Sequence, residues 1–195
     1  VIRGVLVEGR QTGVNPRVMA QRIRDSIGLV PSQEKALANY RLSLESGDWS
    51  RALGYQLSDG RSDRTIARFR RDGGALSTAQ IDSMVERYRV NALSYRAETI
   101  ARTEAMTAAN SGASDAMEQA VSRGDVKAEE LITTWHAGPR TKDSRDSHAA
   151  LDGTSIKFGE LFVLANGTRM RRPGDGPVAE VANCRCTIST TFRLD

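Results

Sequence analysis

The feature that most constrains the fold of this chain is a long central segment without helix-breaking residues. No glycine or proline occurs between Ala75 and Ser111, and Ser77 with Gln80 three residues later forms the capping-box pattern that begins a helix. After this cap, apolar residues form one stripe at helical spacing: Ile81, Met84, Val85, Tyr88 and Leu93. The pattern predicts one helix of about 35 residues, or two helices hinged near residues 90–94. A long unbroken helix is more typical of an assembly component than of a compact enzyme.

Shorter helices are predicted before this segment and strands after it. Apolar periodicity with caps and terminal glycines indicates helices over residues 16–27, 32–45 and 63–72. Beyond residue 124 the pattern shortens and alternates, which indicates strands over residues 131–135, 162–165 and 186–192. Asn166-Gly167 is a strong hairpin signal and leads into a further strand over residues 168–171.

These elements predict an α+β protein. A helical N-terminal arm with a long helix precedes a small C-terminal module that contains a β-hairpin and short strands. We place the mainly helical region at residues 1–123 and the small α+β module at residues 124–195.

Composition excludes several classes of protein. With 195 residues the chain can bury a core without disulfides, and its two cysteines, one residue apart, are poorly placed to form one. No stretch approaches the ~20 apolar residues of a membrane-spanning helix, and the first residues lack the order of a signal peptide. We therefore expect a soluble protein with reduced cysteines and no membrane partner.

The chain has a net charge of +4, and its basic residues are 24 arginines and 4 lysines. Arginine suits phosphate and carboxylate partners.

The residues able to bind a soft metal lie together in the last third of the chain. Zinc takes about four N or S ligands at ~2.0–2.3 Å, and cysteines two positions apart in an extended segment project to the same face. His148, Cys184 and Cys186 are therefore candidate zinc ligands. The fourth ligand has three candidates: His136, Asp143 and Asp146.

The cysteine spacing leaves a second interpretation open. The two-residue knuckle spacing of common zinc sites is absent, so both cysteines could instead be buried small apolar residues. His148 would then donate a hydrogen bond to Asp152 or to a backbone carbonyl. This interpretation requires no cofactor, whereas the first implies one structural zinc ion.

The same region contains the side chains of a nuclease-like active site. His148 would serve as the general base, Asp143 or Asp152 would orient it, and Arg145 would hold a phosphate. Cys184 as a nucleophile with His148 as its base is a further variant. Histidines in such clusters often organise a loop by hydrogen bonding alone. A nuclease-like enzyme centred on His148 and a zinc-stabilised DNA-binding module are therefore the alternatives to a structural role.

Two arginine clusters are candidate contacts for a negatively charged partner. They comprise Arg64, Arg68, Arg70 and Arg71 in the third predicted helix, and Arg169, Arg171 and Arg172 at the predicted hairpin. No interleaved aromatic residues would stack on bases, so contact with double-stranded DNA would be nonspecific and sensitive to salt. Neutralisation by Asp63, Asp72 and Asp175 at a solvated surface is the alternative.

Several motifs follow one another in order between about residues 80 and 190. The first is residues 97–104, which end in Arg102, Thr103 and Glu104 and are followed by Asn110. In the C-terminal module the series continues with Trp135, Asp143, Arg145, His148, residues 151–153, a turn at 173–175 and residues 183–186. In this order and spacing the chain resembles the phage Mu F-type minor head protein family, which includes phage head morphogenesis proteins. Residues 136–140 depart from the family pattern.

The resemblance implies a noncatalytic structural protein of tailed bacteriophages. It would be a minor head protein of the virion, located at the portal vertex after assembly in the host cytoplasm. Its partners would be the portal protein and other head components, and its role would be head assembly, genome packaging or DNA ejection. Phage double-stranded DNA would be a nonspecific partner. We favour a protein contact because acidic residues nearly balance the basic ones.

The resemblance also implies structural or interaction roles for six residues: Arg102, Glu104, Trp135, Asp143, Arg145 and Asp152. We expect Arg102 and Glu104 to supply an ion pair that fastens the long helix to the C-terminal module. Trp135 is expected to anchor the core of that module, because large aromatic side chains are mostly buried.

Overall fold

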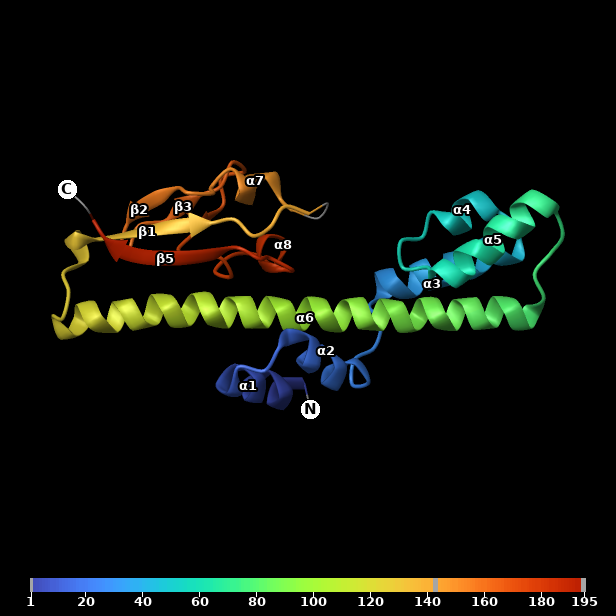
Figure 1. The fold of residues 1–195 in the computed structure, drawn as a ribbon, viewed down its shortest axis with the longest axis horizontal. Helices are drawn as coiled ribbons and strands as arrows, with labels where there is room; N and C mark the ends of the chain where they lie inside the picture. The colour runs from blue at the N-terminus through green and yellow to red at the C-terminus, as the bar shows by residue number, and fades with distance from the viewer. Residues whose placement is uncertain (1, 142–143, 194–195) are drawn as a thin grey trace. The chain divides into compact units, whose positions relative to one another are not determined.

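The computed structural model describes residues 2–141 and 144–193. The helices of the described chain are α1 (Ile2–Thr12), α2 (Pro16–Arg24), α3 (Pro31–Glu45), α4 (Trp49–Leu53), α5 (Gly60–Asp72), α6 (Thr78–Arg123), the short 3-10 helix η1 (Ala128–Glu130), α7 (Asp146–Ala149) and α8 (Val178–Val181). The strands are β1 (Leu131–His136), β2 (Ser155–Lys157), β3 (Phe162–Val163), β4 (Arg169–Met170) and β5 (Thr187–Phe192). Figure 1 labels most of these elements on the ribbon.

The chain divides into two compact units, and α6 contributes residues to both. The first unit is formed mainly by Ala20–Glu98, and the second by Arg3–Met19 together with the chain from Thr99 onward. The division predicted at residue 123 coincides with the end of α6. The division of the chain into a mainly helical region at residues 1–123 and a small α+β module at residues 124–195 stays a prediction.

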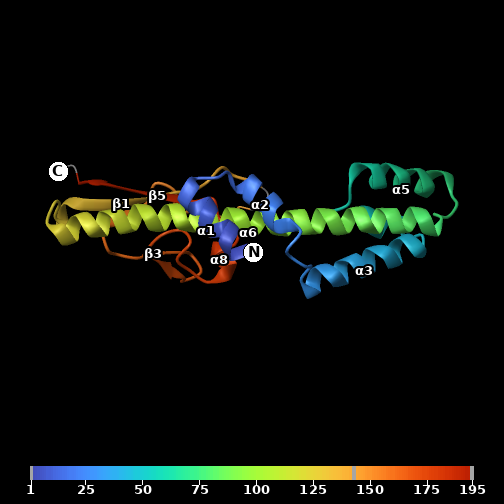
Figure 2. The same cartoon turned by 90° about the horizontal axis from the view of Figure 1, so that it is seen from below.

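The first unit is a helical cluster built on the N-terminal part of α6. Ile81, Met84 and Tyr88 are buried at spacings of three and four residues, which places them on one face of α6. Residues of α3, α4 and α5 complete this core: Tyr40, Leu44, Ala52 and Ile66. Tyr40 stacks on Tyr88 with ring centroids 4.9 Å apart. Figure 2 shows α3 and α5 on either side of this part of α6.

α6 is a single helix of 46 residues. It begins at the predicted capping box, in which the Gln80 N–H donates to Ser77 Oγ (3.3 Å) and the Ser77 N–H donates to Gln80 Oε1 (2.9 Å). The structure excludes the alternative of two hinged helices, because the helix passes through residues 90–94 without a break. It also continues through Gly112, since the cost of one glycine, about 1 kcal/mol relative to alanine, is small beside the packing of a long helix.

The second unit contains a three-stranded antiparallel sheet in the order β2-β1-β5. Along the central strand β1, the side chains of Leu131, Thr133 and Trp135 are buried, in the alternation expected of a sheet with one covered face. The short strands β3 and β4 form the predicted hairpin, and Gly167 in its turn has a φ of 83°. The core of the module consists of Trp135, Leu151, Phe162, Leu164, Met170, Cys184 and Cys186.

The predicted α+β class and the order of its main elements are confirmed. α1, α4, α7, α8 and β2 were not predicted. Most of them are too short to display periodicity, and the eleven residues of α1 include two glycines. α5 begins at Gly60, before the predicted start, because Asp59 caps it by accepting the Ser62 N–H (2.6 Å). In the described part of the chain, no helix combines the length and hydrophobicity that a bilayer crossing requires.

Candidate functional site

Short elements of the C-terminal module bring both cysteines and one histidine together. His148 lies on α7, a single helical turn. Cys184 and Cys186 lie in the segment between α8 and β5. This segment turns at Asn183, which has a φ of 59°. Asparagine tolerates this left-handed conformation better than most residues.

The imidazole ring of His148 faces both sulfur atoms. Its Nδ1 lies 3.5 Å from Cys184 Sγ and 3.6 Å from Cys186 Sγ. The ligand atoms of the three residues all lie within 4.8 Å of one another, and each residue is at most 5% exposed. The structure therefore brings together the three residues that the sequence indicates as zinc ligands.

A buried carboxylate holds the other side of the His148 ring. His148 Nε2 lies 2.8 Å from Oε2 of Glu180, which is 8% exposed. Glu180 in turn accepts a hydrogen bond from Asn166 Nδ2 (2.7 Å) and lies 3.7 Å from the Nε of Arg145. The indole ring of Trp135, which is completely buried, meets His148 edge-on with centroids 5.4 Å apart. The position and tilt of the imidazole are thus fixed from several sides.

The two thiols differ in acidity. Their mutual hydrogen bond, together with burial, raises the pKa of Cys184 far above its usual range. The same hydrogen bond lowers the pKa of Cys186 to about 4, against the opposing effect of burial and with help from His148. The Cys186 N–H also donates to Cys184 Sγ (3.4 Å). The hydrogen bonds therefore favour the thiolate form of Cys186, which is the form of cysteine that binds metal ions.

A cavity of about 50 Å³ adjoins the cluster and is lined by all three of these residues. Its wall also includes three arginines: Arg140, Arg145 and Arg185. Glycine is required at position 138, because a Cβ there would lie 2.6 Å from both the Cβ and the carbonyl oxygen of Arg185. The segment around Gly138 thus approaches the cysteine segment closely.

The motif residues of α6 hold the cysteine segment. Arg102 donates to Asn183 Oδ1, and the Asn183 N–H donates to Thr103 Oγ1 (2.8 Å). Asn110 is 2% exposed. Its side chain donates to the carbonyl oxygen of Cys186 (3.0 Å) and accepts a hydrogen bond from the Ile188 N–H (3.2 Å). Arg102 therefore joins the helix to the module through a neutral amide, where the sequence predicted an ion pair. The role of Glu104 stays a prediction.

The other described residues of the module that the sequence indicated as candidates do not join the cysteine cluster. Asp143 lies outside the described residues. Asp152 is exposed and accepts the Ala137 N–H (2.8 Å), so that it organises the loop after β1 and does not contact His148. His136 Nε2 forms a hydrogen bond with Ser189 Oγ of β5 (2.7 Å). Asp146 forms an ion pair with Arg140 (3.0 Å). His136 and Asp146 are therefore engaged elsewhere than at the cysteines.

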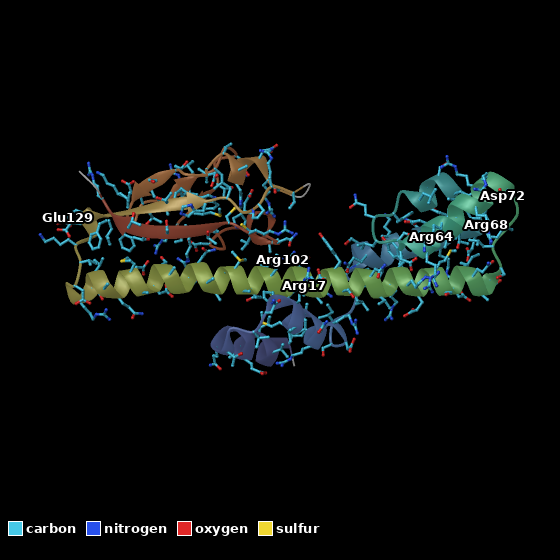
Figure 3. All side chains as sticks on the ribbon, viewed as in Figure 1. Arg17, Arg64, Arg68, Asp72, Arg102 and Glu129 are labelled. Atoms are coloured by element: carbon cyan, nitrogen blue, oxygen red, sulfur yellow. The ribbon has the colours of Figure 1, made fainter. Side chains whose placement is uncertain are left out.

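A second candidate surface is the arginine face of α5. The opposite side of this helix is buried through Ser62 and Ile66. The arginine face consists of four exposed residues at helical spacing: Arg61, Arg64, Arg68 and Arg71. Figure 3 labels Arg64 and Arg68 along α5, and Asp72 at its C-terminal end. Arg70 is also exposed but projects from another side of the helix.

Acidic residues neutralise only part of this face. Asp72 pairs with Arg71 at 2.7 Å. Asp63 instead accepts a hydrogen bond from Ser58 Oγ (2.6 Å). Among the residues that the structure describes, no carboxylate forms an ion pair with Arg64 or Arg68. The face therefore keeps a positive charge available to a partner.

The arginines at the hairpin divide into two kinds. Arg169 and Arg171 are exposed. Arg172 is partly buried and donates through Nε and Nη2 to Ser111 Oγ on α6 (3.3 and 3.2 Å). Asp175 accepts the Arg171 backbone N–H (3.3 Å). Arg172 therefore helps to fasten the module to α6, and the first two remain candidate contacts.

Two residues of these sites were absent from the sequence prediction. Arg61 could have been found, because it precedes Arg64 by three residues and so continues the same helical face. Glu180 carried no such signal. It reaches His148 only because the fold brings one residue of α8 to the His148 ring, and that proximity is not encoded in local spacing.

Arg102, Thr103 and Asn110 join the long helix to the terminal module, and all three belong to the motifs by which the sequence resembles bacteriophage head morphogenesis proteins. Comparison with family models makes the assignment specific. The model described as phage Mu protein F like protein matches residues 1–189, and the chain belongs to this family. The predicted resemblance is thereby confirmed over a longer stretch than its motifs covered. Neither a curated protein nor a solved structure matched the chain.

Proposed function

We propose that this head morphogenesis protein is a minor component of the virion at the portal vertex, where it acts in head assembly and in genome packaging or ejection. The observation that carries the proposal is the arginine face of α5. The guanidinium groups lie along one side of α5, and the opposite side of this helix is buried. Such a surface suits an acidic partner, and arginine can bind carboxylates through two parallel hydrogen bonds.

The acidic partner that we favour is a protein surface, that of the portal. Four arginines on about three turns of helix form a compact patch, and no aromatic platform for bases accompanies it in α5 beyond the partly buried Phe69. Contact with phage DNA would be a phosphate contact without sequence preference. DNA is the alternative partner, and a binding experiment distinguishes it from the portal.

The geometry of His148 argues against the nuclease-like alternative. The ring is 4% exposed, Nε2 is bonded to Glu180, and Nδ1 faces two sulfur atoms. A general base must reach the proton that it removes, and neither nitrogen of this ring is free to do so. We therefore assign His148 a structural role in the module.

The test is binding to the portal protein of the same phage, measured by co-expression and sedimentation. The double variant Arg64→Glu/Arg68→Glu should weaken the complex by at least about tenfold, because each substitution replaces an attraction by a repulsion. The matched control is Arg17→Glu/Arg51→Glu, which makes the same charge change on exposed positions of α2 and α4. Figure 3 labels Arg17 on α2.

Equal binding of the wild type and both variants would contradict a role of the arginine face. Random-sequence double-stranded DNA provides the second arm of the experiment. If DNA binding is lost in the α5 variant and portal binding is retained, the face contacts the genome and the proposed portal contact fails. Melting temperatures of both variants should match that of the wild type, since the substituted side chains are exposed.

A further inference from the structure

We propose that His148 Nδ1, Cys184 Sγ and Cys186 Sγ bind one zinc ion that stabilises the C-terminal module. These are two soft ligands and one borderline ligand, a set typical of zinc in proteins. All three are buried, and they converge from two segments of the chain. The proposal does not depend on the contact between the arginine face and the portal.

Both nitrogen–sulfur distances match those around a tetrahedral ion. With Zn–N and Zn–S bonds of ~2.0–2.3 Å and tetrahedral angles, a ligand nitrogen and sulfur lie about 3.6 Å apart. The observed separations of His148 Nδ1 from the two sulfurs are 3.5 and 3.6 Å. The two nitrogen–sulfur separations are therefore those of a zinc site before any side chain moves.

A simple hydrogen bond between thiol and imidazole explains this arrangement less well. Nδ1 carries either one lone pair or one proton, so that it forms one well-aligned hydrogen bond with a sulfur at a time. The two sulfurs nevertheless lie at nearly the same distance from it. A single ion bound by all three atoms accounts for both distances at once.

The surroundings of the cluster are those that support a metal-bound histidine. Histidine ligands donate their second N–H to a carboxylate, a backbone carbonyl or a water molecule, which leaves the lone pair of the first nitrogen directed at the metal. Glu180 is placed for this role at 2.8 Å from Nε2. The Cys186 N–H donates to Cys184 Sγ, and such a donor stabilises a thiolate. Arg145, near Glu180, balances the charge of the carboxylate.

The fourth coordination position has room for water. The cavity of about 50 Å³ beside the three ligands exceeds the volume that one water molecule needs. Among the residues that the structure describes, no further histidine or carboxylate joins the three in one group. The ion would tie α7 to the segment before β5 and so close the module.

The first experiment uses the unmodified chain. Protein purified under reducing conditions should contain one equivalent of zinc by elemental mass spectrometry, and chelation should lower its melting temperature. Titration of the metal-free protein with Co²⁺ should give the visible bands of tetrahedral cobalt and thiolate-to-cobalt charge transfer, saturating at one equivalent. Absence of these bands, with a melting temperature that neither chelation nor added Zn²⁺ changes, would overturn the proposal.

Variants then assign the ligands. Cys184→Ser, Cys186→Ser and His148→Gln should each lose at least tenfold in Co²⁺ affinity and alter the charge-transfer bands. Glu180→Gln should weaken affinity by about 10- to 100-fold while leaving the bands in place, because it acts through His148. His136→Gln is the matched control at the exposed histidine and should bind like the wild type. Undiminished binding by both serine variants would place the ion elsewhere and refute this site.

Discussion

Asp59 has two roles at the start of α5, the helix that carries the arginine face. Its carboxylate accepts the Ser62 N–H (2.6 Å) as a helix cap and pairs with the Nε of Arg87 (2.7 Å). Burial opposes ionisation, but the hydrogen bonds from Ser62 and the charge of Arg87 outweigh it and lower the pKa of Asp59. A carboxyl group whose pKa is lower in the folded state stabilises the fold above its ordinary pKa. That stabilisation is lost as the pH falls through the lowered value.

Two substitutions separate these roles. Asp59→Ala should reduce the free energy of unfolding at pH 7 by about 1 kcal/mol, because cap and ion pair are both lost. Asp59→Asn keeps a good cap and removes the charge, so its effect should be smaller. Urea denaturation should also show the difference between wild type and Asp59→Asn shrinking as the pH falls below about 4. A difference that stays constant down to pH 2 would show that the charge contributes nothing.

At the scale of elements, α6 contributes residues to both units and continues through a glycine beyond its second contact. Its first part is buried through Ile81, Met84 and Tyr88, and its later part binds the cysteine segment through Arg102 and Asn110. Gly112 lies between this contact and the end of the helix. It is exposed, and a Cβ there would meet no atom within 4 Å. The helix therefore gains nothing in packing from having glycine at this position.

Gly112→Ala should raise the free energy of unfolding by about 0.5–1 kcal/mol, since alanine loses less backbone entropy on entering a helix. Chemical denaturation would measure this directly. Gly174→Ala is the paired control and should destabilise, because Gly174 has a φ of 93° and its added Cβ would lie 2.8 Å from Thr107 Oγ1. A neutral or unfavourable effect at residue 112 would indicate that the glycine serves a contact outside this chain.

At the scale of the whole molecule, the two units have separate cores. The first centres on Tyr40, Ile66 and Tyr88, and the second on Trp135, Phe162 and the two cysteines. Among the described core residues, none belongs to both clusters. The proposed zinc ion lies wholly within the second. Its removal should therefore act on one core and leave the other intact.

Hydrogen exchange can test this separation. Chelation under reducing conditions should accelerate amide exchange in α7, β1 and β5, whose hydrogen bonds the ion would help to hold. Exchange in α3 and α5 should remain as in the untreated protein. Uniform acceleration along the chain would mean that the two cores unfold as one cooperative unit. Unchanged exchange throughout would mean that the metal contributes nothing to the module.

The sequence by itself determined the elements that depend on near neighbours. The capping box of Ser77 and Gln80, the periodicity of α6 and the turn at Asn166-Gly167 are set by interactions within about four residues. The same local rules identified the α5 arginines other than Arg61. Residue chemistry singled out His148, Cys184 and Cys186, because they are the two cysteines of the chain and one of its two histidines.

Only the tertiary structure decided which of these residues meet. The bond of His148 to Glu180 joins positions 32 residues apart, and that of Asn110 to Cys186 joins positions 76 apart. Such contacts depend on how α7, α8 and the later part of α6 pack together, and no spacing in the sequence records this. Packing likewise places the Asp152 carboxylate where it accepts a hydrogen bond from the Ala137 N–H and not from His148. Buried polar groups such as Glu180 and Asn110 bond the partners that packing brings to them, because leaving them unsatisfied would be costly.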